Sequence, residues 1–172
     1  MATRCLAIHA LPVQVTRLPG CDEFYSQYAA TVYRTARRIT GNPADAEDVL
    51  QTVFLRVLSK RGLTLEIQSA EAYFRRAATN ASIDVLRRRM TKAETPLDGL
   101  AMQPAQESTP LLKERLRRAI AQLDTEDAQL FLLRHLEGLS TEELALQFGI
   151  EKGTVGSRLH RIRQALQRVI ED

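Results

Sequence analysis

A stretch near the end of the sequence carries basic and hydroxyl side chains at helical spacing. Between Lys152 and Arg168 there are five Lys or Arg residues and no Asp or Glu. On a helix, one polar face of this stretch would carry Gly153, Ser157, His160, Arg161 and Gln164, with Arg158 and Arg163 beside them. Such a face can neutralise phosphates and donate hydrogen bonds to base edges, which is the chemistry of DNA recognition.

The residues before this face predict the turn that positions it. Ser140 is a good N-cap and Glu143 can complete a capping box, so we expect a first helix to follow. Gly149 can end that helix, and Ile150 can fill the angle before a second helix. The apolar stripe of the second helix is Val155, Leu159, Ile162, Leu166 and Val169. The pattern predicts a helix-turn-helix whose second helix enters the DNA major groove. The alternative is a bundle helix pair with a solvated basic face.

The N-terminal half also predicts helices. Apolar residues spaced by four and three indicate a helix over residues 22–41, followed by Asn42 and Pro43 as the N-cap and first turn of the next helix. Ser69 would cap a third helix, which has six bases and one acid between positions 75 and 92. Tyr73 and Phe74 lie just upstream, and bases near aromatics suit a partly unstacked nucleic-acid strand. A solvated helix end is the alternative.

The chain divides at a stretch rich in proline. Residues 93–110 contain three prolines, three acids and no base, which predicts a flexible linker. We therefore expect an N-terminal extension over residues 1–21, a helical bundle over 22–92, and a four-helix domain with the helix-turn-helix over 111–172. No strand is predicted, so the expected fold class is all-α, with two small helical domains.

Composition excludes several classes of protein. No apolar run is long enough to span a membrane, and the first residues lack a convincing signal peptide, so we expect no membrane insertion and a cytoplasmic location. Cys5 and Cys21 are predicted to be isolated, inert thiols, and no metal site is expected. The three histidines are scattered, and phosphate loops, HExxH and nucleophile elbows are absent. We expect no catalytic residues, no cofactor and no enzymatic activity.

Two long motifs in the right order resemble a known family. EFYSQYAATVYRTARRITGNPADAEDVLQTVFLRV and AYFRRAATNASIDVLRRR resemble region 2 of extracytoplasmic-function (ECF) type RNA polymerase sigma factors of the sigma-70 family, and LFLLRHLEGLSTEELALQFGIEKGTVGSRLHRIRQAL is similar to region 4. The resemblance covers about residues 22–170. It implies that residues 22–92 bind core polymerase and recognise the minus-ten element, and that residues 111–172 recognise the minus-thirty-five element.

The resemblance also implies roles for individual residues. Binding to core polymerase would involve Asp45, Asp48, Gln51, Phe54 and Leu55. The minus-ten element and a base flipped from the non-template strand would be held by Tyr73, Arg76, Asn80 and Asp84, with the preceding loop from Leu63 to Gln68, and phosphates by Arg87, Arg88 and Arg89. Contacts to the minus-thirty-five element would come from Lys152, Gly156, Ser157, Arg158, His160 and Arg161, of which Lys152 and Arg158 suit the DNA backbone.

Three positions depart from the family pattern. Gly156 replaces a larger, often basic residue, which removes a base contact and weakens the helix by ~1 kcal/mol relative to alanine. Glu151 stands at the usual Ser or Thr cap of the recognition helix. Leu58 stands where tryptophan is common, so a melting role for that position is not expected.

These observations predict an alternative sigma factor that binds core RNA polymerase and directs transcription initiation. Its expected partners are core polymerase, promoter DNA as a duplex and as a melted non-template strand, and an anti-sigma factor. Two alternatives remain open. One is a helix-turn-helix regulator that acts without being a polymerase subunit, and the other is an adaptor whose helices bind only protein.

Overall fold

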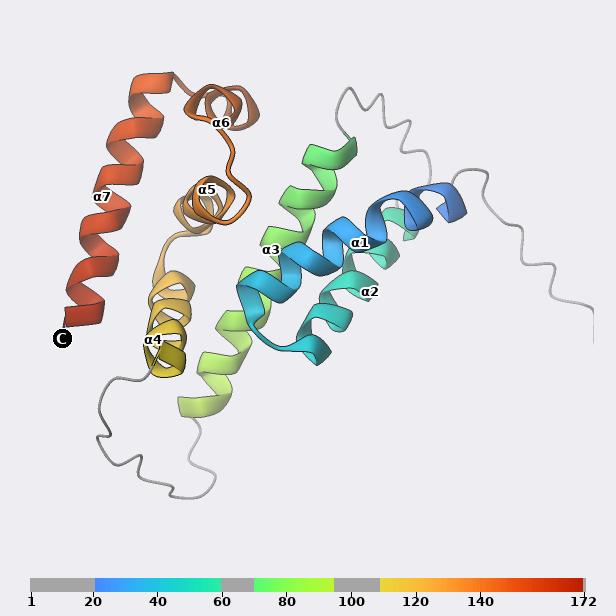
Figure 1. Cartoon of the computed structure of the whole chain (residues 1–172), viewed down its shortest axis with the longest axis horizontal. Coiled ribbons are helices and arrows are strands. Elements are labelled where there is room, and N and C mark those ends of the chain that lie inside the picture. The colour runs from blue at the N-terminus through green and yellow to red at the C-terminus, as the bar shows by residue number, and fades with distance from the viewer. Residues whose placement is uncertain (1–20, 60–69, 95–108, 172) are drawn as a thin grey trace, which may run out of the picture.

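The computed structural model describes residues 21–59, 70–94 and 109–171, and every element within these ranges is an α-helix (Figure 1). The N-terminal helices are α1 (Cys21–Thr40), α2 (Pro43–Ser59) and α3 (Ala70–Glu94). The C-terminal helices are α4 (Thr109–Gln122), α5 (Thr125–His135), α6 (Thr141–Phe148) and α7 (Lys152–Glu171). The predicted all-α fold is confirmed. Among these helices, none combines the length and apolar character needed to cross a membrane.

An aromatic cluster forms the centre of the N-terminal domain, where α1, α2 and α3 pack together. Phe74 of α3 is completely buried, and its ring lies 4.7 Å from the Tyr28 ring and 5.3 Å from the Phe54 ring, measured between centroids. The Phe24 ring closes the cluster at 6.2 Å from Phe74. Since the rings come from all three helices, this cluster fixes the helices against one another and thereby sets the direction of α3.

The turn between α1 and α2 follows the prediction. Gly41 has a φ of +73°, a left-handed conformation that glycine adopts without steric cost. Asn42 then caps α2, because its Oδ1 accepts a hydrogen bond from the Ala44 N–H at 2.9 Å. The next helix therefore starts at Pro43, as predicted.

The C-terminal domain has an aliphatic core. Leu130 and Leu133 of α5 meet Leu144 of α6 and Ile162 of α7, and all four side chains are buried. Asp124 caps α5 by accepting a hydrogen bond from the Glu126 N–H at 3.0 Å. α4 packs against α7 and completes the domain.

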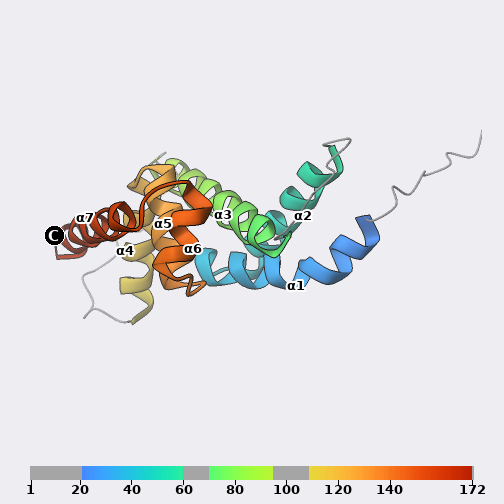
Figure 2. The same ribbon diagram turned by 90° about the horizontal axis from the view of Figure 1, so that it is seen from above.

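The two domains are packed together in this structure, and α3 is the helix they share. α3 contacts α1 and α2 on one side and α4 and α5 on the other, as Figures 1 and 2 show from two directions. Ile83 and Leu86 of α3, with Ile39 of α1, belong to the same buried cluster as the C-terminal core. These three side chains form an apolar seam between the domains, and this seam is continuous with the core of the C-terminal domain.

The predicted linker is longer than the structure allows. α3 continues to Glu94 and α4 begins at Thr109, so two residues at each end of the predicted segment are helical. At the C-terminal end the difference arises because proline at position 110 fits the first turn of a helix as well as a loop. The rest of the linker, residues 1–20 of the predicted N-terminal extension, the Ser69 cap and the loop from Leu63 to Gln68 lie outside the described residues, whereas residue 21 is the first of α1.

Candidate nucleic-acid interface

The helix-turn-helix forms with the local chemistry that its sequence predicted. Ser140 Oγ accepts from the Glu143 N–H at 3.1 Å, while the Ser140 N–H donates to Glu143 Oε2 at 2.7 Å, which closes the capping box of α6. Gly149 ends α6 with a φ of +64°. Ile150 then packs against the core between α6 and α7. This turn fixes the angle between α6 and α7.

α7 separates an apolar face from a polar face, as predicted for its first four turns. The buried side chains are Val155, Leu159, Ile162 and Leu166. Val169, which completed the predicted stripe, is 44% exposed, and its neighbour Ile170 is half-buried against the domain in its place. The exposed side chains on the outer face include Ser157, His160 and Arg161, with Gly156 beside them. This outer face has the types and spacing of side chains that reach into a major groove.

Arg158 is held inside the domain and is not presented on the outer face. Its Nη2 lies 2.6 Å from Asp127 Oδ1 and 3.2 Å from Glu126 Oε2, and its side chain is only 18% exposed. Burial disfavours the charge, but the hydrogen bonds and charges of Asp127 and Glu126 outweigh it and raise the pKa of Arg158. The predicted role of Arg158 at the DNA backbone therefore competes with a structural role that ties α7 to α5.

Lys152, the other predicted backbone contact, is exposed and pairs with Glu142 of α6. The hydrogen bond from Lys152 lowers the pKa of Glu142 below its ordinary value. Because both side chains are more than half exposed, the pair is weak, and the ammonium group can turn to a phosphate at little cost.

Gly156 is an exposed glycine in the interior of α7, and a Cβ added there would meet no atom within 4 Å. We expect Gly156→Ala to raise the free energy of unfolding by about 0.5–1 kcal/mol, since alanine loses less backbone entropy on helix formation. Urea unfolding followed by circular dichroism measures the change. Gly149→Ala is the matched control and will destabilise, because Gly149 has a positive φ. An unchanged or lower stability for Gly156→Ala would contradict the prediction.

On α3, the structure brings together part of the predicted minus-ten set. At about 100° per residue, Tyr73, Asn80 and Asp84 fall on one face of the helix, and Arg88 continues it as an exposed residue. Asn80 Oδ1 is buried and has no hydrogen-bond partner among the described residues. Asp84 is about half exposed and forms a 3.8 Å ion pair with Arg56. This face therefore carries polar groups with unused hydrogen-bonding capacity.

The other predicted bases of α3 are engaged within the protein. Arg76 donates to the Gln147 carbonyl at 3.1 Å, and its guanidinium lies 4.9 Å above the centre of the Phe148 ring. Arg87 makes three hydrogen bonds to the turn between α4 and α5. Arg89 points to the opposite side of α3 and contacts Thr40 and Asp45. Sequence reasoning could not distinguish these from Arg88, because all of them are bases on the same helix and their partners come from distant segments.

Some of the predicted polymerase-binding residues are exposed, and others are engaged within the protein. Asp48, Gln51 and Leu55 are exposed on α2, and the Leu55 side chain is 62% exposed. Phe54 instead lies in the aromatic core, where it cannot reach a partner without leaving the core. That prediction for Phe54 is corrected by the structure. Asp45 is half-buried and paired with Arg89.

Two features were missed at the sequence level. Ile83, Leu86 and Met90 form a second apolar stripe on α3, opposite the stripe that contains Phe74, and it packs against the C-terminal domain. The spacing of this second stripe could have predicted from the sequence that α3 is buried on two sides. The second missed feature is Glu137, which follows α5 and points into the N-terminal domain. Nothing in its sequence position identified it.

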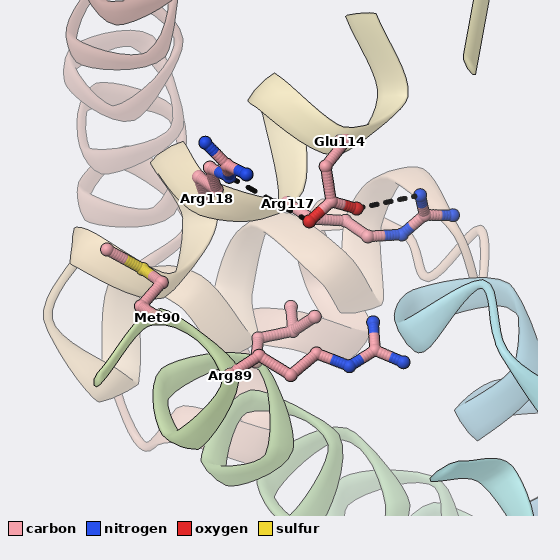
Figure 3. A pocket seen from close by; sticks show the side chains of 6 residues that line it. Arg89, Met90, Glu114, Arg117 and Arg118 are labelled. Atoms are coloured by element: carbon pink, nitrogen blue, oxygen red, sulfur yellow. Dashed lines mark ion pairs between the residues drawn. The ribbon is translucent and has the colours of Figure 1, made fainter. Parts of the chain in front are cut away.

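A small cleft opens beside the seam between α3 and α4 and is lined by Arg89, Met90, Glu114, Arg117 and Arg118 (Figure 3). Glu114 pairs with Arg117 at 3.7 Å and with Arg118 at 3.9 Å, so its charge offsets part of the basic lining. In the described ranges, no group of three or more His, Cys, Asp and Glu side chains is arranged so that it could hold a metal ion. Arg89, Arg117 and Arg118 make the cleft lining predominantly basic, which suits an anion.

Sequence profiles match both halves of the chain. The profile for "Sigma-70 region 2" matches residues 24–91, and the profile for "Sigma-70, region 4" matches residues 113–166. These ranges contain most of α1 to α3 and most of α4 to α7, respectively. The two candidate faces described above thus fall in separate matched regions.

Relatives from actinobacteria resemble the chain along most of its length. It is 35% identical over 158 residues to an ECF RNA polymerase sigma factor, SigE, of Mycolicibacterium smegmatis, which covers 87% of this chain and 61% of that relative. It is 33% identical to the RNA polymerase sigma-E factor of Streptomyces coelicolor, over 88% of this chain and 84% of the relative. The chain therefore spans less than two thirds of the first relative and most of the second.

A solved structure shares the fold. The sigma factor RpoE, determined in complex with the anti-sigma factor NepR from Bartonella quintana, aligns with a TM-score of 0.51. The alignment covers 90% of this chain and 98% of the other at 20% sequence identity. At this identity the likeness supports the arrangement of helices alone.

Proposed function

The chain belongs to the sigma-70 family and resembles its ECF RNA polymerase sigma factors, and on this premise we propose that it is an alternative sigma factor. It binds core RNA polymerase, recognises two promoter elements and helps to open the duplex. It contributes binding energy and no catalysis of its own, and it acts in the cytoplasm with the polymerase.

The strongest support for the proposal comes from the outer face of α7. The outer face of α7 presents Ser157, His160 and Arg161 to solvent on a helix whose other face is buried in the domain. A helix held in this way can lie in a major groove, where the Arg161 guanidinium can donate two hydrogen bonds to the O6 and N7 of a guanine. Gly156 leaves open space beside this set, which lets the helix approach the base edges closely.

The exposed face of α3 supports recognition of the second promoter element, the minus-ten element. The free acceptor of Asn80 and the half-exposed carboxylate of Asp84 can accept hydrogen bonds from a base that has left the stack. Tyr73 is partly exposed and rests edge-on against Phe74, so its ring has a fixed position for stacking. Stacking and base-edge contacts together offset the few kcal/mol that unstacking a base costs.

The exposed face of α2 supports docking on polymerase. Asp48, Gln51 and Leu55 combine a charge, an amide and a large apolar side chain on one exposed surface. A partner that covers Leu55 gains hydrophobic burial, and an opposite charge facing Asp48 fixes its orientation. An anti-sigma factor that covers either DNA-recognition face or this surface would silence the protein. The solved sigma factor that shares the fold was captured with such a partner.

Reconstituted transcription tests the proposal. Core RNA polymerase, the full chain and a pool of promoter fragments should give transcripts that start at a specific subset of the pool. The chain alone should bind duplex fragments weakly, because the DNA-recognition faces of α3 and α7 both contact the promoter only when the chain is bound to polymerase. Tight duplex binding without polymerase and no specific start in its presence would contradict the proposal and favour an ordinary regulator.

A further inference from the structure

A carboxylate from the C-terminal domain is enclosed by bases of the N-terminal domain. Glu137, in the turn between α5 and α6, has a side chain that is only 9% exposed. Its Oε1 accepts a hydrogen bond from Thr35 Oγ1 at 3.0 Å and lies 3.7 Å from Arg38 Nη1. Its Oε2 lies 3.7 Å from Arg75 Nε. The pairs join positions 102, 99 and 62 residues apart, so they hold the domains together and not merely a local turn.

The bases around Glu137 have more capacity than one carboxylate can use. The cleft is lined by Arg34, Arg37, Arg38 and Arg75 from α1 and α3, and Glu137 is its only acidic lining residue. Both arginine contacts to Glu137 exceed hydrogen-bond length. Arg75 Nη2 donates to Glu71 Oε1 at 2.5 Å, but Arg75 Nε is buried with no hydrogen-bond partner among the described residues. A phosphate has more acceptor oxygens than a carboxylate, so it would satisfy this cluster better.

The same packing covers Arg87 of α3, which the family resemblance assigns to DNA phosphates. Arg87 donates to the Ala121 carbonyl at 3.2 Å, to the Leu123 carbonyl at 2.9 Å and to Thr125 Oγ1 at 2.9 Å. The Ala121 and Leu123 carbonyls lie at the C-terminal end of α4. Carbonyls at a helix C-terminus lack partners in their own helix, and the helix dipole favours a cation there. Arg87 therefore cannot reach a phosphate while the domains are packed together.

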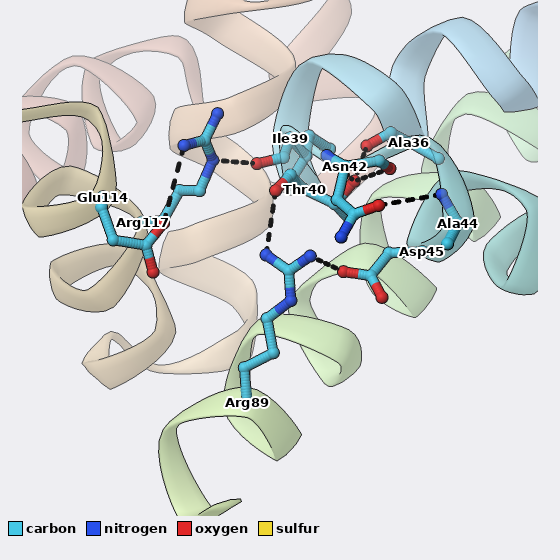
Figure 4. Close-up of polar contacts among 9 residues, drawn as sticks. All are labelled: Ala36, Ile39, Thr40, Asn42, Ala44, Asp45, Arg89, Glu114 and Arg117. Carbon is cyan, nitrogen blue, oxygen red and sulfur yellow. Dashed lines mark hydrogen bonds and ion pairs between the residues drawn. The ribbon is translucent and has the colours of Figure 1, made fainter. Parts of the chain in front are cut away.

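A second capping contact lies at the other end of the seam. Arg117 of α4 donates to the Ile39 carbonyl at 3.0 Å, and Arg89 of α3 donates to the Thr40 carbonyl at 3.1 Å (Figure 4). Both carbonyls belong to the last turn of α1. The Arg117 guanidinium packs against Gly41 so closely that an added Cβ would overlap it. The close approach shows that the seam is a specific contact built from both domains.

We propose that Thr35, Arg38 and Arg75 form a phosphate-binding site for nucleic acid, and that Glu137 occupies this site as an intramolecular latch. In the closed arrangement the Glu137 carboxylate takes the place of a phosphate and keeps Arg87 covered. When the domains separate, the same bases become available to a DNA strand. The inference rests on the proposed function for the identity of its ligand, whereas the latch itself rests on the contacts above.

Binding of a labelled single-stranded oligonucleotide to the full chain tests the inference. We expect Glu137→Gln to raise the affinity at low salt by about 5-fold or more, because it weakens the closed state that competes with the ligand. Small-angle X-ray scattering should show a larger radius of gyration for this variant. Glu23→Gln is the charge-matched control, since Glu23 is exposed at the start of α1, far along that helix from the latch, and it should leave both quantities near the wild type.

A second substitution separates the latch from the site. Adding Arg38→Ala to Glu137→Gln should remove most of the gain in affinity but leave the larger radius of gyration. Adding Lys113→Ala, an exposed base of α4 without a part in the latch, should preserve most of the gain. If Glu137→Gln lowers the thermal midpoint so far that folding is incomplete, Glu137→Asp replaces it, because the shorter side chain weakens the same contacts and should shift both quantities in the same direction.

Three results would overturn the inference. They are a Glu137→Gln variant that matches the wild type in both measurements, one that opens without binding more tightly, and a gain that survives Arg38→Ala. Specific transcription with core polymerase is measured in parallel. If transcription fails but the latch variants behave as expected, the proposed function is wrong and the latch stands. If transcription succeeds and the variants do not differ, the latch is wrong.

Discussion

Arg161→Ala will reduce specific transcription from a cognate promoter by about 5- to 150-fold, which corresponds to losing one good base contact of about 1–3 kcal/mol. The side chain is exposed on the outer face of α7, and the helix under it is anchored by Leu159 and Ile162. Removal should therefore cost DNA affinity without loosening the domain. The fold change is measured as initial transcript yield with saturating core polymerase.

Arg168→Ala is the matched control for this effect. Arg168 is also exposed, on nearly the same face of α7, but it lies two turns further from the helix start. Since a recognition helix reads bases with its N-terminal residues, Arg168→Ala should weaken binding slightly and equally on all promoters. Equal losses for the two variants, or an Arg161→Ala loss that is the same on every sequence, would show that Arg161 contacts only phosphate.

Phe74→Ala will lower the free energy of unfolding of the N-terminal domain by about 3–5 kcal/mol, the usual cost of emptying a buried aromatic site. Phe74 is fully buried and its ring contacts rings from α1 and α2, so no single helix can move to fill the space. Because small domains are stable by only about 5–15 kcal/mol, the variant will be close to unfolding at physiological temperature. Urea titration followed by circular dichroism measures the loss.

Phe74→Leu and Tyr25→Ala serve as controls. Phe74→Leu keeps an apolar side chain in the site and should cost clearly less than Phe74→Ala. Tyr25 also contacts an aromatic ring of the cluster, at 4.9 Å from Phe54, but it is half exposed and its loss leaves no closed cavity. A Phe74→Ala cost no larger than that of Tyr25→Ala would mean that the cluster does not hold the three helices together.

The local parts of the fold could be predicted because their chemistry is local. Ser140, Glu143 and Gly149 specify the ends of α6 within a few residues, and all three behave as their types predict. The spacing of the apolar residues predicted which face of α7 is buried, with Val169 as the exception at the end of the helix. For the same reason the outward positions of Ser157, His160 and Arg161 followed from the sequence.

Contacts between distant segments could not be predicted in the same way. Arg76 was expected at the minus-ten element, and Arg87 and Arg89 at DNA phosphates, but carbonyls and rings from other helices now engage each of them. A guanidinium has the same charge and donors toward a carbonyl as toward a phosphate, so its residue type does not identify its partner. Phe54 was assigned to a partner surface for a similar reason, since large apolar residues serve cores and interfaces alike.

The apolar seam along α3 also makes the balance between closed and open forms depend on temperature. Ile83 and Leu86 are almost fully buried against the C-terminal domain, so separating the domains exposes them to water. Burial of such side chains is driven mainly by entropy near room temperature, and it weakens on cooling. The polar contacts of the seam do not share this dependence. Cooling will therefore favour separation of the two domains, and moderate warming will favour their association until the domains themselves begin to unfold.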